Sequence, residues 1–519
     1  MSTVVNEVNR VTSENNRADQ PIYQKLCDAV QEATLLARIQ HLLEWDEQTK
    51  MPKAGGAYRA DQMAYMAGLV HQKQTAPEIG EWLDQLVDSP LADDPTSDTG
   101  ANIAHLRRDY DKKTRLPQSL VEQLAKACTL GQQVWVEARN ADDFKKFQPN
   151  LEEILCLKRE EAAALGYEQT PYDPLLDDYE PGESTANVAR VLSELRDALV
   201  PLVQAIAESK QRPDASLLAR SYPVEAQESF GIAAAKRIGF DFGAGRLDVT
   251  AHPFCTGLGP GDVRITTRYD EHAFSDAFFG ILHETGHGLY DQGLPRKHYG
   301  LPIGEDVSLG IHESQSRMWE NQVGRSRAFW EHFYPQAQAA FPAALKDVAK
   351  EEFYGAINDV RPSLVRVEAD EVTYNLHILI RFELEQALIE DRLQVADLPG
   401  AWNEKYQHYL GITPPSDADG VLQDVHWSAG LFGYFPTYAL GNLYSAQFFR
   451  QAAADLGDLD ASFRKGDFSS LLSWLRENIH RHGRRYSPAE LVERITGTPL
   501  QHEPLISQLT AKYGEIYGL

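Results

Sequence analysis

The chain has 519 residues, of which 43% are hydrophobic and 24% charged, a composition typical of a folded globular protein. Its formal net charge of −26 argues against nucleic acid or an anionic membrane as the main partner. The four cysteines form no CxxC pair, so neither a thiolate zinc site nor a disulfide framework is expected. The sequence lacks an apolar run of the ~20 residues that span a bilayer, and its first 20 residues lack the apolar core of a signal peptide. We therefore expect a cytoplasmic protein without membrane contact.

Helical periodicity dominates the first half of the chain. Residues 1–20 are polar and are predicted to be a disordered lead-in, and apolar residues then recur at three- and four-residue steps from Pro21 to Leu43. A break at 51–56 precedes another predicted helix that runs through His71. Further helices are predicted at 117–139, 149–165 and 185–210. Since no low-complexity linker divides the chain, residues 21–519 are predicted to form one domain, either two-lobed or a large helical body.

The pattern changes between about residues 246 and 270. Residues 247–251 and 263–269 come close to the alternation of β-strands, and the Gly/Pro-rich segment 257–261 between them is a strong turn signal. We predict two short strands joined through this segment into a hairpin. Such a hairpin can be simple scaffolding, but extended peptides can pair with an exposed strand edge, so its position favours a place beside a cleft.

The helix predicted at 271–291 carries the sequence His283-Glu284-Thr285-Gly286-His287. Residues four apart share a helix face, so the two histidines can hold one metal ion, with Glu284 beside that face. Two histidines and a glutamate at this spacing form the zincin signature, in which zinc is the Lewis acid and the glutamate the general base. A buried histidine is more often a satisfied core residue, but two of them around a costly buried carboxylate favour a metal site.

A metal site of this kind requires a third ligand. The metzincin extension would place glycine at 290 and histidine at 293, where the chain has Tyr290 and Gly293. The alternative is a glutamate from a second helix, and the segment 306–323 offers Glu313 and Glu320. The stretch around Glu313 is the better candidate, although spacing alone does not choose between them. Either glutamate could also be an exposed helix charge.

From about Ile22 to the C-terminus, the chain resembles the thermostable (Taq-type) metallocarboxypeptidase family of HEXXH zinc carboxypeptidases. The resemblance rests on several blocks in the family's order, which is more specific than one pentapeptide. These blocks are Trp45-Asp46 with Thr49 and Met51-Pro52, His252-Pro253-Phe254, Asp262-Val263-Arg264-Ile265-Thr266, the zincin pentapeptide, His312-Glu313-Ser314-Gln315, Val365-Arg366-Val367-Glu368-Ala369-Asp370, and Gly420-Val421-Leu422-Gln423-Asp424-Val425-His426-Trp427. One conservative departure is Val365, where the family usually has Ile or Leu.

The resemblance implies a mainly α fold: a large two-lobed helical body around a deep channel, with a small β-sheet beside the active site, commonly as a homodimer. It also implies a carboxypeptidase that releases single amino acids from peptide C-termini with broad specificity. By motif position, His283, His287 and Glu313 would be the metal ligands and Glu284 the general base. One divalent ion per chain is expected. Zinc is the first choice and cobalt an alternative, because imidazole and carboxylate ligands accept several metals.

Such a reaction requires two further kinds of group. The developing oxyanion needs a donor besides the metal, and Tyr434 and His426 are the candidates. A carboxypeptidase also needs a cation for the substrate's free carboxylate, which the planar fork of arginine suits. Arg366 is the first choice and Arg264 the second. Each of the four could instead be a buried core residue or part of a structural salt bridge.

Two other functions are consistent with the same residues. A zinc endopeptidase or oligopeptidase would have the same ligand set but would cleave peptides with amidated C-termini. A catalytically silent helical scaffold that binds peptides is the second alternative. The complete ligand set and the presence of Glu284 argue against that scaffold.

Overall fold

Helices make up about 69% of the protein, whose computed structural model describes residues 2–519, with side chains described from Asp19 on. The α-helices are α1 Ser2–Thr49, α2 Gly56–Gln74, α3 Pro77–Leu86, α4 Asp98–Arg115, α5 Gln118–Ala141, α6 Phe144–Leu165, α7 Asp173–Leu176, α8 Thr185–Glu208, α9 Val224–Ile238, α10 Phe274–Gly293, α11 Leu309–Arg317, α12 Arg327–Ala340, α13 Pro342–Leu345, α14 Lys350–Ile357, α15 Tyr374–Ile389, α16 Leu398–Leu410, α17 Pro436–Leu456, α18 Leu459–Arg464, α19 Ser469–Asn478, α20 Pro488–Thr496 and α21 Glu503–Tyr517. Directly after α11 follows one π-helical segment, η5 Met318–Val323.

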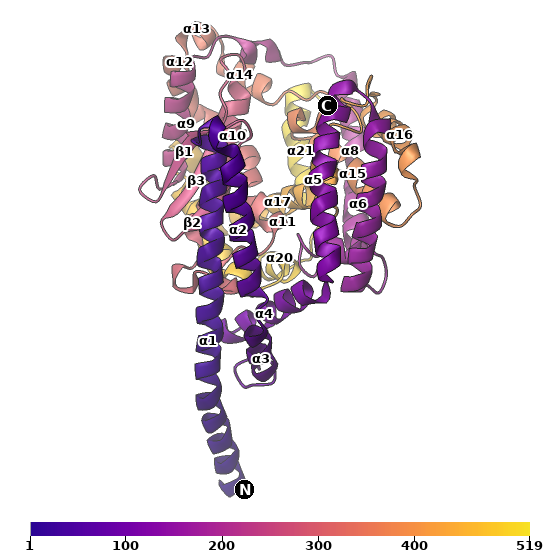
Figure 1. Ribbon diagram of the computed structural model, residues 1–519. Coiled ribbons are helices and arrows are strands. Elements are labelled where there is room, and N and C mark those ends of the chain that lie inside the picture. The colour runs from indigo at the N-terminus through magenta and orange to yellow at the C-terminus, as the bar shows by residue number, and fades with distance from the viewer. Residues whose placement is uncertain (1) are drawn as a thin grey trace.

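The helices form two groups with α11 and α17 between them (Figure 1). One group contains α9, α10 and α12, and the other contains α5, α6, α8, α15 and α21. Helix α11 packs along α17 and also against α10, so the middle of the molecule is where the two groups meet. The long helix α1 packs against α2 and runs past the first group (Figure 1). The predicted mainly α, two-lobed fold is confirmed.

Local sequence signals explain where several of these helices begin and end. The helices predicted at 117–139, 149–165 and 185–210 are confirmed as α5, α6 and α8. Helix α5 ends at Asp142, which is left-handed (φ 53°), and Asp143 caps α6 by accepting a hydrogen bond from the Lys145 N–H. Ser184 caps α8 in the same way, from the Asn187 N–H. These caps satisfy N–H groups that have no partner inside the helix.

The sheet differs from the predicted hairpin. It contains β1 Gly245–Val249, β2 Cys255–Gly259 and β3 Asp262–Thr267, and within residues 2–519 these three strands have the order β1-β3-β2. The two strands that the alternation pattern predicted, β1 and β3, pair in parallel, and the predicted turn segment forms most of a third strand, β2, antiparallel to β3. The residues of β2 are all half-buried, so this strand has no inside–outside alternation that a sequence pattern could reveal.

Helix α10 lies in the largest hydrophobic core and is buried along most of its length. Phe274 and Phe278 stack with ring centroids 5.4 Å apart, and Trp330 of α12 lies 5.3 Å from Phe278. Aromatic pairs of this kind add about 0.5–1.5 kcal/mol beyond the burial of their area. A smaller core lies under α1, α3 and α4, where Leu26 and Leu83 are fully buried. The rigid packing of α10 fixes the helix that carries the zincin sequence.

Two glycines allow the central helices to approach closely. A Cβ at Gly286 of α10 would lie 2.5 Å from the Gln315 carbonyl oxygen and the Ser316 Cα of α11. A Cβ at Gly441 of α17 would lie 2.5 Å from the Cγ of Glu313. Helix α11 is therefore held between α10 and α17 at a distance that only glycine permits.

The predicted division into a lead-in of residues 1–20 and a catalytic domain of residues 21–519 stays a prediction. Helix α1 includes residues from Ser2 on, and the side chains of residues 1–18 lie outside those that the structure describes. In the described part of the chain, no helix combines the length and the apolar composition that crossing a membrane requires.

The contact at Gly286 leads to a test within one helix. We expect Gly286→Ala to destabilise the protein by about 1–3 kcal/mol, because the added methyl meets backbone atoms that cannot rotate away. Gly280 is the matched control on α10, since a Cβ there meets only the Thr267 hydroxyl, at 4.0 Å. Gly280→Ala should be neutral, or stabilise by up to about 1 kcal/mol through helix propensity. Thermal and urea unfolding of both variants measure the difference. Equal stabilities would contradict the close approach.

Candidate metal centre

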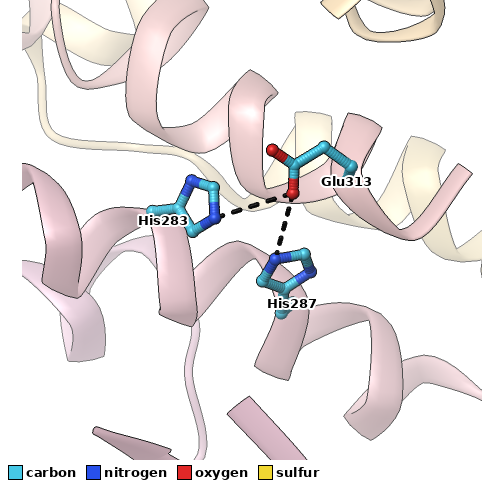
Figure 2. Close-up of side chains that lie close together, drawn as sticks. All are labelled: His283, His287 and Glu313. Carbon is cyan, nitrogen blue, oxygen red and sulfur yellow. Dashed lines mark ion pairs between the residues drawn. The ribbon is translucent and has the colours of Figure 1, made fainter. Parts of the chain in front are cut away.

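Helix α10 presents His283 and His287 on one face, one turn apart, with ring centroids 4.9 Å from each other. Both side chains are mostly buried, and Glu284 beside them is 6% exposed. As the four-residue spacing predicts, both imidazoles point toward the same side of helix α10 (Figure 2).

Helix α11 brings the carboxylate of Glu313 to these two rings. Its Oε2 lies 3.7 Å from Nε2 of His283 and 3.4 Å from Nε2 of His287, and the three side chains point toward one another in Figure 2. Atoms bound to one ion at 2.0–2.2 Å in tetrahedral geometry lie about 3.3–3.6 Å apart. One ligand atom from each residue lies within 4.8 Å of the others. The donor set and its spacing therefore fit a divalent metal ion.

The second glutamate considered from the sequence lies on the other side of His283. Oε2 of Glu320 is 3.0 Å from Nδ1 of that ring, while Glu313 faces Nε2. Glu320 belongs to η5, where the Gly324 N–H bonds to the Trp319 carbonyl oxygen in the wider π pattern. The two glutamates thus occupy different places: one faces the possible metal position, and the other orients the ring.

The positive charge of Arg317 partly offsets the negative charges of Glu313 and Glu320. Its Nε donates to Oε1 of Glu313 at 2.7 Å, and its Nη1 donates to Oε2 of Glu320 at 3.2 Å. Burial alone would raise the pKa values of the two glutamates. Arg317 and the histidines outweigh burial, so that the pKa of Glu313 lies well below its ordinary value and that of Glu320 is about 2. Both side chains are therefore ionised and available as acceptors or ligands.

His287 is held by a chain of two further side chains. Its Nδ1 lies 2.5 Å from Nδ1 of His312, and Nε2 of His312 lies 3.1 Å from Oδ1 of Asp291. Asp291 stands one turn beyond His287 on α10. This arrangement leaves Nε2 of His287 directed at Glu313. Sequence reasoning missed Asp291, His312 and Arg317 in these orienting roles, although His312 stood inside a recognised block.

Glu284 follows the candidate ligand His283 in the sequence and lines the same cavity as the three candidate ligands. Burial raises its pKa from 4.5 to about 7; His283 opposes the rise and Glu313 adds to it. A carboxylate with a pKa near 7 exchanges protons readily at neutral pH.

The site opens into a cavity of about 570 Å³. Helix α10, strand β2, helix α11 and the start of α17 form its walls, and α1 contributes Arg38 and His41. Nη1 of Arg38 donates to the carbonyl oxygen of Gly257 at 3.1 Å, and its guanidinium also forms an ion pair with Glu305. Arg38 was not predicted, because its contacts join residues more than two hundred positions apart.

The two predicted oxyanion donors, Tyr434 and His426, lie next to each other, but only Tyr434 is among the described residues that line the cavity. Tyr434 lines the cavity. Its ring is 5.4 Å from that of His426, which is packed behind it and is not among the described residues that line the cavity. Burial raises the pKa of Tyr434, so its hydroxyl keeps its proton. The pKa of His426 is lowered to about 4, mainly by burial, so this ring is neutral at neutral pH.

The two predicted arginines are both in ion pairs. Arg366 donates from Nε to Oδ1 of Asp424 at 3.0 Å, and its guanidinium lies 5.1 Å from the ring centre of Tyr438, which lines the cavity. Arg264 forms two 2.9 Å bonds to Asp262 and lies 4.2 Å from the ring centre of Trp45. Arg366 is not among the described residues that line the cavity, but its guanidinium packs against the cavity-lining ring of Tyr438. Arg264 is not among the described residues that line the cavity.

Two helices that direct two imidazoles and a carboxylate at one buried point, with another glutamate beside it, define the site of a metallopeptidase. The chain belongs to the Carboxypeptidase Taq (M32) metallopeptidase family, whose profile matches residues 25–513. The resemblance seen in the sequence is confirmed.

Relatives and solved structures agree with this assignment. The chain is 50% identical to "Thermostable carboxypeptidase 1" of Thermus thermophilus, over 96% of this chain and 99% of the relative. It is 40% identical to "Carboxypeptidase 1" of Bacillus subtilis, over 93% and 98% of the two chains. The crystal structure of an M32 carboxypeptidase from Deinococcus radiodurans superposes with a TM-score of 0.93 at 42% identity, covering 96% of this chain and all of the other. The protein is a metal-dependent carboxypeptidase that hydrolyses peptide bonds.

A buried carboxylate holds the loop that contains His426 and Tyr434. Glu385 of α15 accepts hydrogen bonds from the Tyr172 hydroxyl at 2.6 Å, the Trp427 indole at 2.7 Å and the Gly433 N–H at 3.1 Å. Burial raises its pKa from 4.5 to about 7, although these three donors oppose the rise. The loop is therefore fixed by an acid that titrates near neutrality.

This pKa shift leads to a test of stability against pH. The folded protein binds the proton of Glu385 more tightly than the unfolded chain, so its contribution to stability is complete below pH 4.5 and is lost as the pH rises to about 7. The shift corresponds to about 3 kcal/mol. Glu385→Gln cannot ionise, so the wild type should lose about 3 kcal/mol relative to this variant over that window. Urea unfolding at several pH values measures both. Parallel curves would contradict the shift.

Proposed function

We propose that His283, His287 and Glu313 hold one divalent metal ion, and that this ion is the cofactor of the carboxypeptidase reaction. The convergence of these three side chains on one buried point carries the proposal. Zinc is the first choice, because two imidazoles and a carboxylate suit it, and cobalt is the alternative. When bound, such a metal supplies a Lewis acid that polarises a carbonyl and lowers the pKa of a water toward 7.

We further propose that Glu284 is the general base. It lines the cavity beside the candidate ligands, and an ionised carboxylate at that place can take up a proton from the attacking water. The same carboxyl group then delivers that proton to the departing amine. Because Glu284 is neutral after the first transfer and ionised after the second, it is restored at the end of each cycle.

The oxyanion requires a hydrogen-bond donor from the chain itself. We propose Tyr434 for this role, because its protonated hydroxyl lines the cavity. His426 is the second candidate; its ring packs against Tyr434 and could also keep that side chain in place. Removal of one such donor typically reduces kcat by about 10²–10³.

The role of Glu284 is tested by Glu284→Gln, which removes the base and keeps the side-chain shape. We expect kcat to fall by about 10²–10⁴, while metal content per chain is unchanged. Metal analysis and hydrolysis of a free-acid peptide, on the same sample, measure both quantities and also identify the native metal. Asp276→Asn is the matched control, since Asp276 is an exposed carboxylate in the first turn of the same helix. Retained activity in Glu284→Gln would exclude Glu284 as the base.

The free carboxylate of the peptide requires a cation, and we propose Arg366. Its guanidinium is directly behind Tyr438 of the cavity wall, and its contacts to Asp424 and Tyr374 use its Nε, Nη1 and Nη2 atoms. A guanidinium has five N–H donors, so donors remain for a carboxylate once the aromatic side chain moves. Arg264 stays the second choice, since both its bonds are to Asp262 on its own strand.

The relatives named carboxypeptidase argue against the endopeptidase and scaffold alternatives.

This role predicts a selective loss of affinity. In Arg366→Ala we expect kcat/KM for a free-acid peptide to fall about 100-fold, mostly through KM, because a charge-assisted bond is worth about 1.5–3 kcal/mol. The low activity on the matching amidated peptide should not fall further. Arg361→Ala, five residues upstream and exposed, is the control. An equal loss on both peptides would assign Arg366 a structural role only.

The remaining expectations concern the setting of the enzyme. We propose peptides of broad C-terminal sequence as substrates. We also propose a homodimer, since exposed apolar side chains are grouped on the α1–α2 pair (Leu35, Ile39, Tyr58 and Tyr65), which a second copy could cover. The mass of the protein in solution tests the proposed homodimer.

We also propose the cytoplasm, a reducing compartment, which is consistent with the free state of Cys27, Cys128, Cys156 and Cys255.

A further inference from the structure

Helix α11 begins on a buried carboxylate from a distant part of the chain. Oε2 of Glu180 accepts a hydrogen bond from the Gly310 N–H at 3.1 Å, and Oε1 accepts from the Ser308 hydroxyl at 3.0 Å. The Tyr444 hydroxyl of α17 donates to the same Oε1 at 2.8 Å. The neighbouring Tyr179 carbonyl oxygen accepts from the Leu309 N–H at 3.1 Å. Residues 179 and 180 therefore contact each of the residues 308–310 at which α11 starts.

Glu180 is fully buried, and none of the described residues forms an ion pair with it. Burial raises its pKa to about 8, against the effect of its three donors. A buried carboxyl group without a cation costs stability. Its contacts therefore point to a positional role: it accepts the Gly310 N–H, which has no partner inside α11, and fixes where that end lies.

The bonds of Glu180 act on the position of α11 along its axis, because they are made to the residues at its start. Sideways movement is limited by the contacts at Gly286 and Gly441. The bonds to Ser308 and Gly310 restrain sliding and rotation at the N-terminal end of the helix, and the His312–Asp291 bond adds a restraint further along it. Glu313 lies one turn after Gly310 on this helix. A shift of the N-terminus by a fraction of an ångström therefore moves the Glu313 carboxylate relative to the two histidines.

We propose that Glu180 is a positioning residue, which sets the distance of the Glu313 carboxylate from His283 and His287 by anchoring the start of α11. The inference rests on the proposed role of Glu313 as a metal ligand. It assigns to Glu180 an effect on metal affinity that is separate from its effect on folding.

The experiment compares three substitutions of Glu180 in the full-length protein. Zinc dissociation constants are measured on the folded apo-protein by competition with a chromophoric chelator, and thermal unfolding of the apo-protein is measured separately. Glu180→Ala should weaken zinc binding about 10-fold, within the range seen when residues that orient ligands are removed. Glu180→Asp keeps the carboxyl group but withdraws it by one methylene, and should also weaken binding. Glu180→Gln keeps length and an acceptor, and should bind zinc within about 3-fold of wild type.

Glu183→Ala is the matched control, since the side chain of that neighbouring glutamate accepts its hydrogen bonds from Ser184 and Asn187 at the α8 start, and its backbone bond to the Glu180 carbonyl oxygen is kept in the variant. Its zinc affinity should equal that of the wild type. A lower melting temperature with unchanged zinc affinity in Glu180→Ala overturns the inference, because a purely structural residue behaves in that way. If Glu180→Ala does not fold, equal affinities of Glu180→Asp and Glu180→Gln overturn it instead.

Glu313→Ala separates failure of this inference from failure of the proposed function. If Glu313→Ala binds zinc as tightly as the wild type, Glu313 is not a ligand and both ideas are wrong. If Glu313→Ala loses zinc binding while the Glu180 variants keep it, only the positioning role is wrong.

Discussion

The ion pair between Glu313 and Arg317 is the interaction on which the site depends. Two imidazoles and three carboxylates (Glu284, Glu313 and Glu320) are packed into a mostly buried volume, where unpaired charges are costly. Arg317 donates to two of these carboxylates and lies 4.3 Å from the ring centre of Tyr374, so one cation joins α11, η5 and α15. Arg317 and the histidines together lower the pKa values of Glu313 and Glu320, whereas burial dominates at Glu284 and raises its pKa.

Three buried carboxylates hold separate segments together around the site. Glu180 anchors the start of α11, Glu385 holds the loop that contains Tyr434, and Asp424 lies between Arg366 and Arg381. Each accepts several hydrogen bonds from segments that are distant in the sequence. Burial of these groups lowers stability, but it restricts the loops to one arrangement. The regular helices supply the bulk of the core, and these few polar anchors determine where the site residues point.

Local patterns in the sequence predict the parts of the protein that depend on short-range contacts. The helices α5, α6 and α8 have clear periodicity and capping residues, and the histidine pair follows from the helical repeat alone. The third ligand did not follow from spacing, since Glu313 and Glu320 are seven residues apart and lie on similar faces. Only the packing of η5 shows that they approach opposite nitrogens of His283. Strand β2 was missed because it is glycine-rich and half-buried throughout, and Arg38 because its contacts are distant in sequence.

The π-helical turn after α11 has a consequence for how the gene can change. A π-helix has more residues per turn than an α-helix, so a single deletion within 318–323 would convert this turn to the α repeat and change where its own side chains point. Glu320 would then leave Nδ1 of His283 and the nearby guanidinium of Arg325. Insertions and deletions are tolerated in most surface loops of a protein. In this segment the length of the chain is itself a requirement of the site, because it sets where Glu320 meets His283.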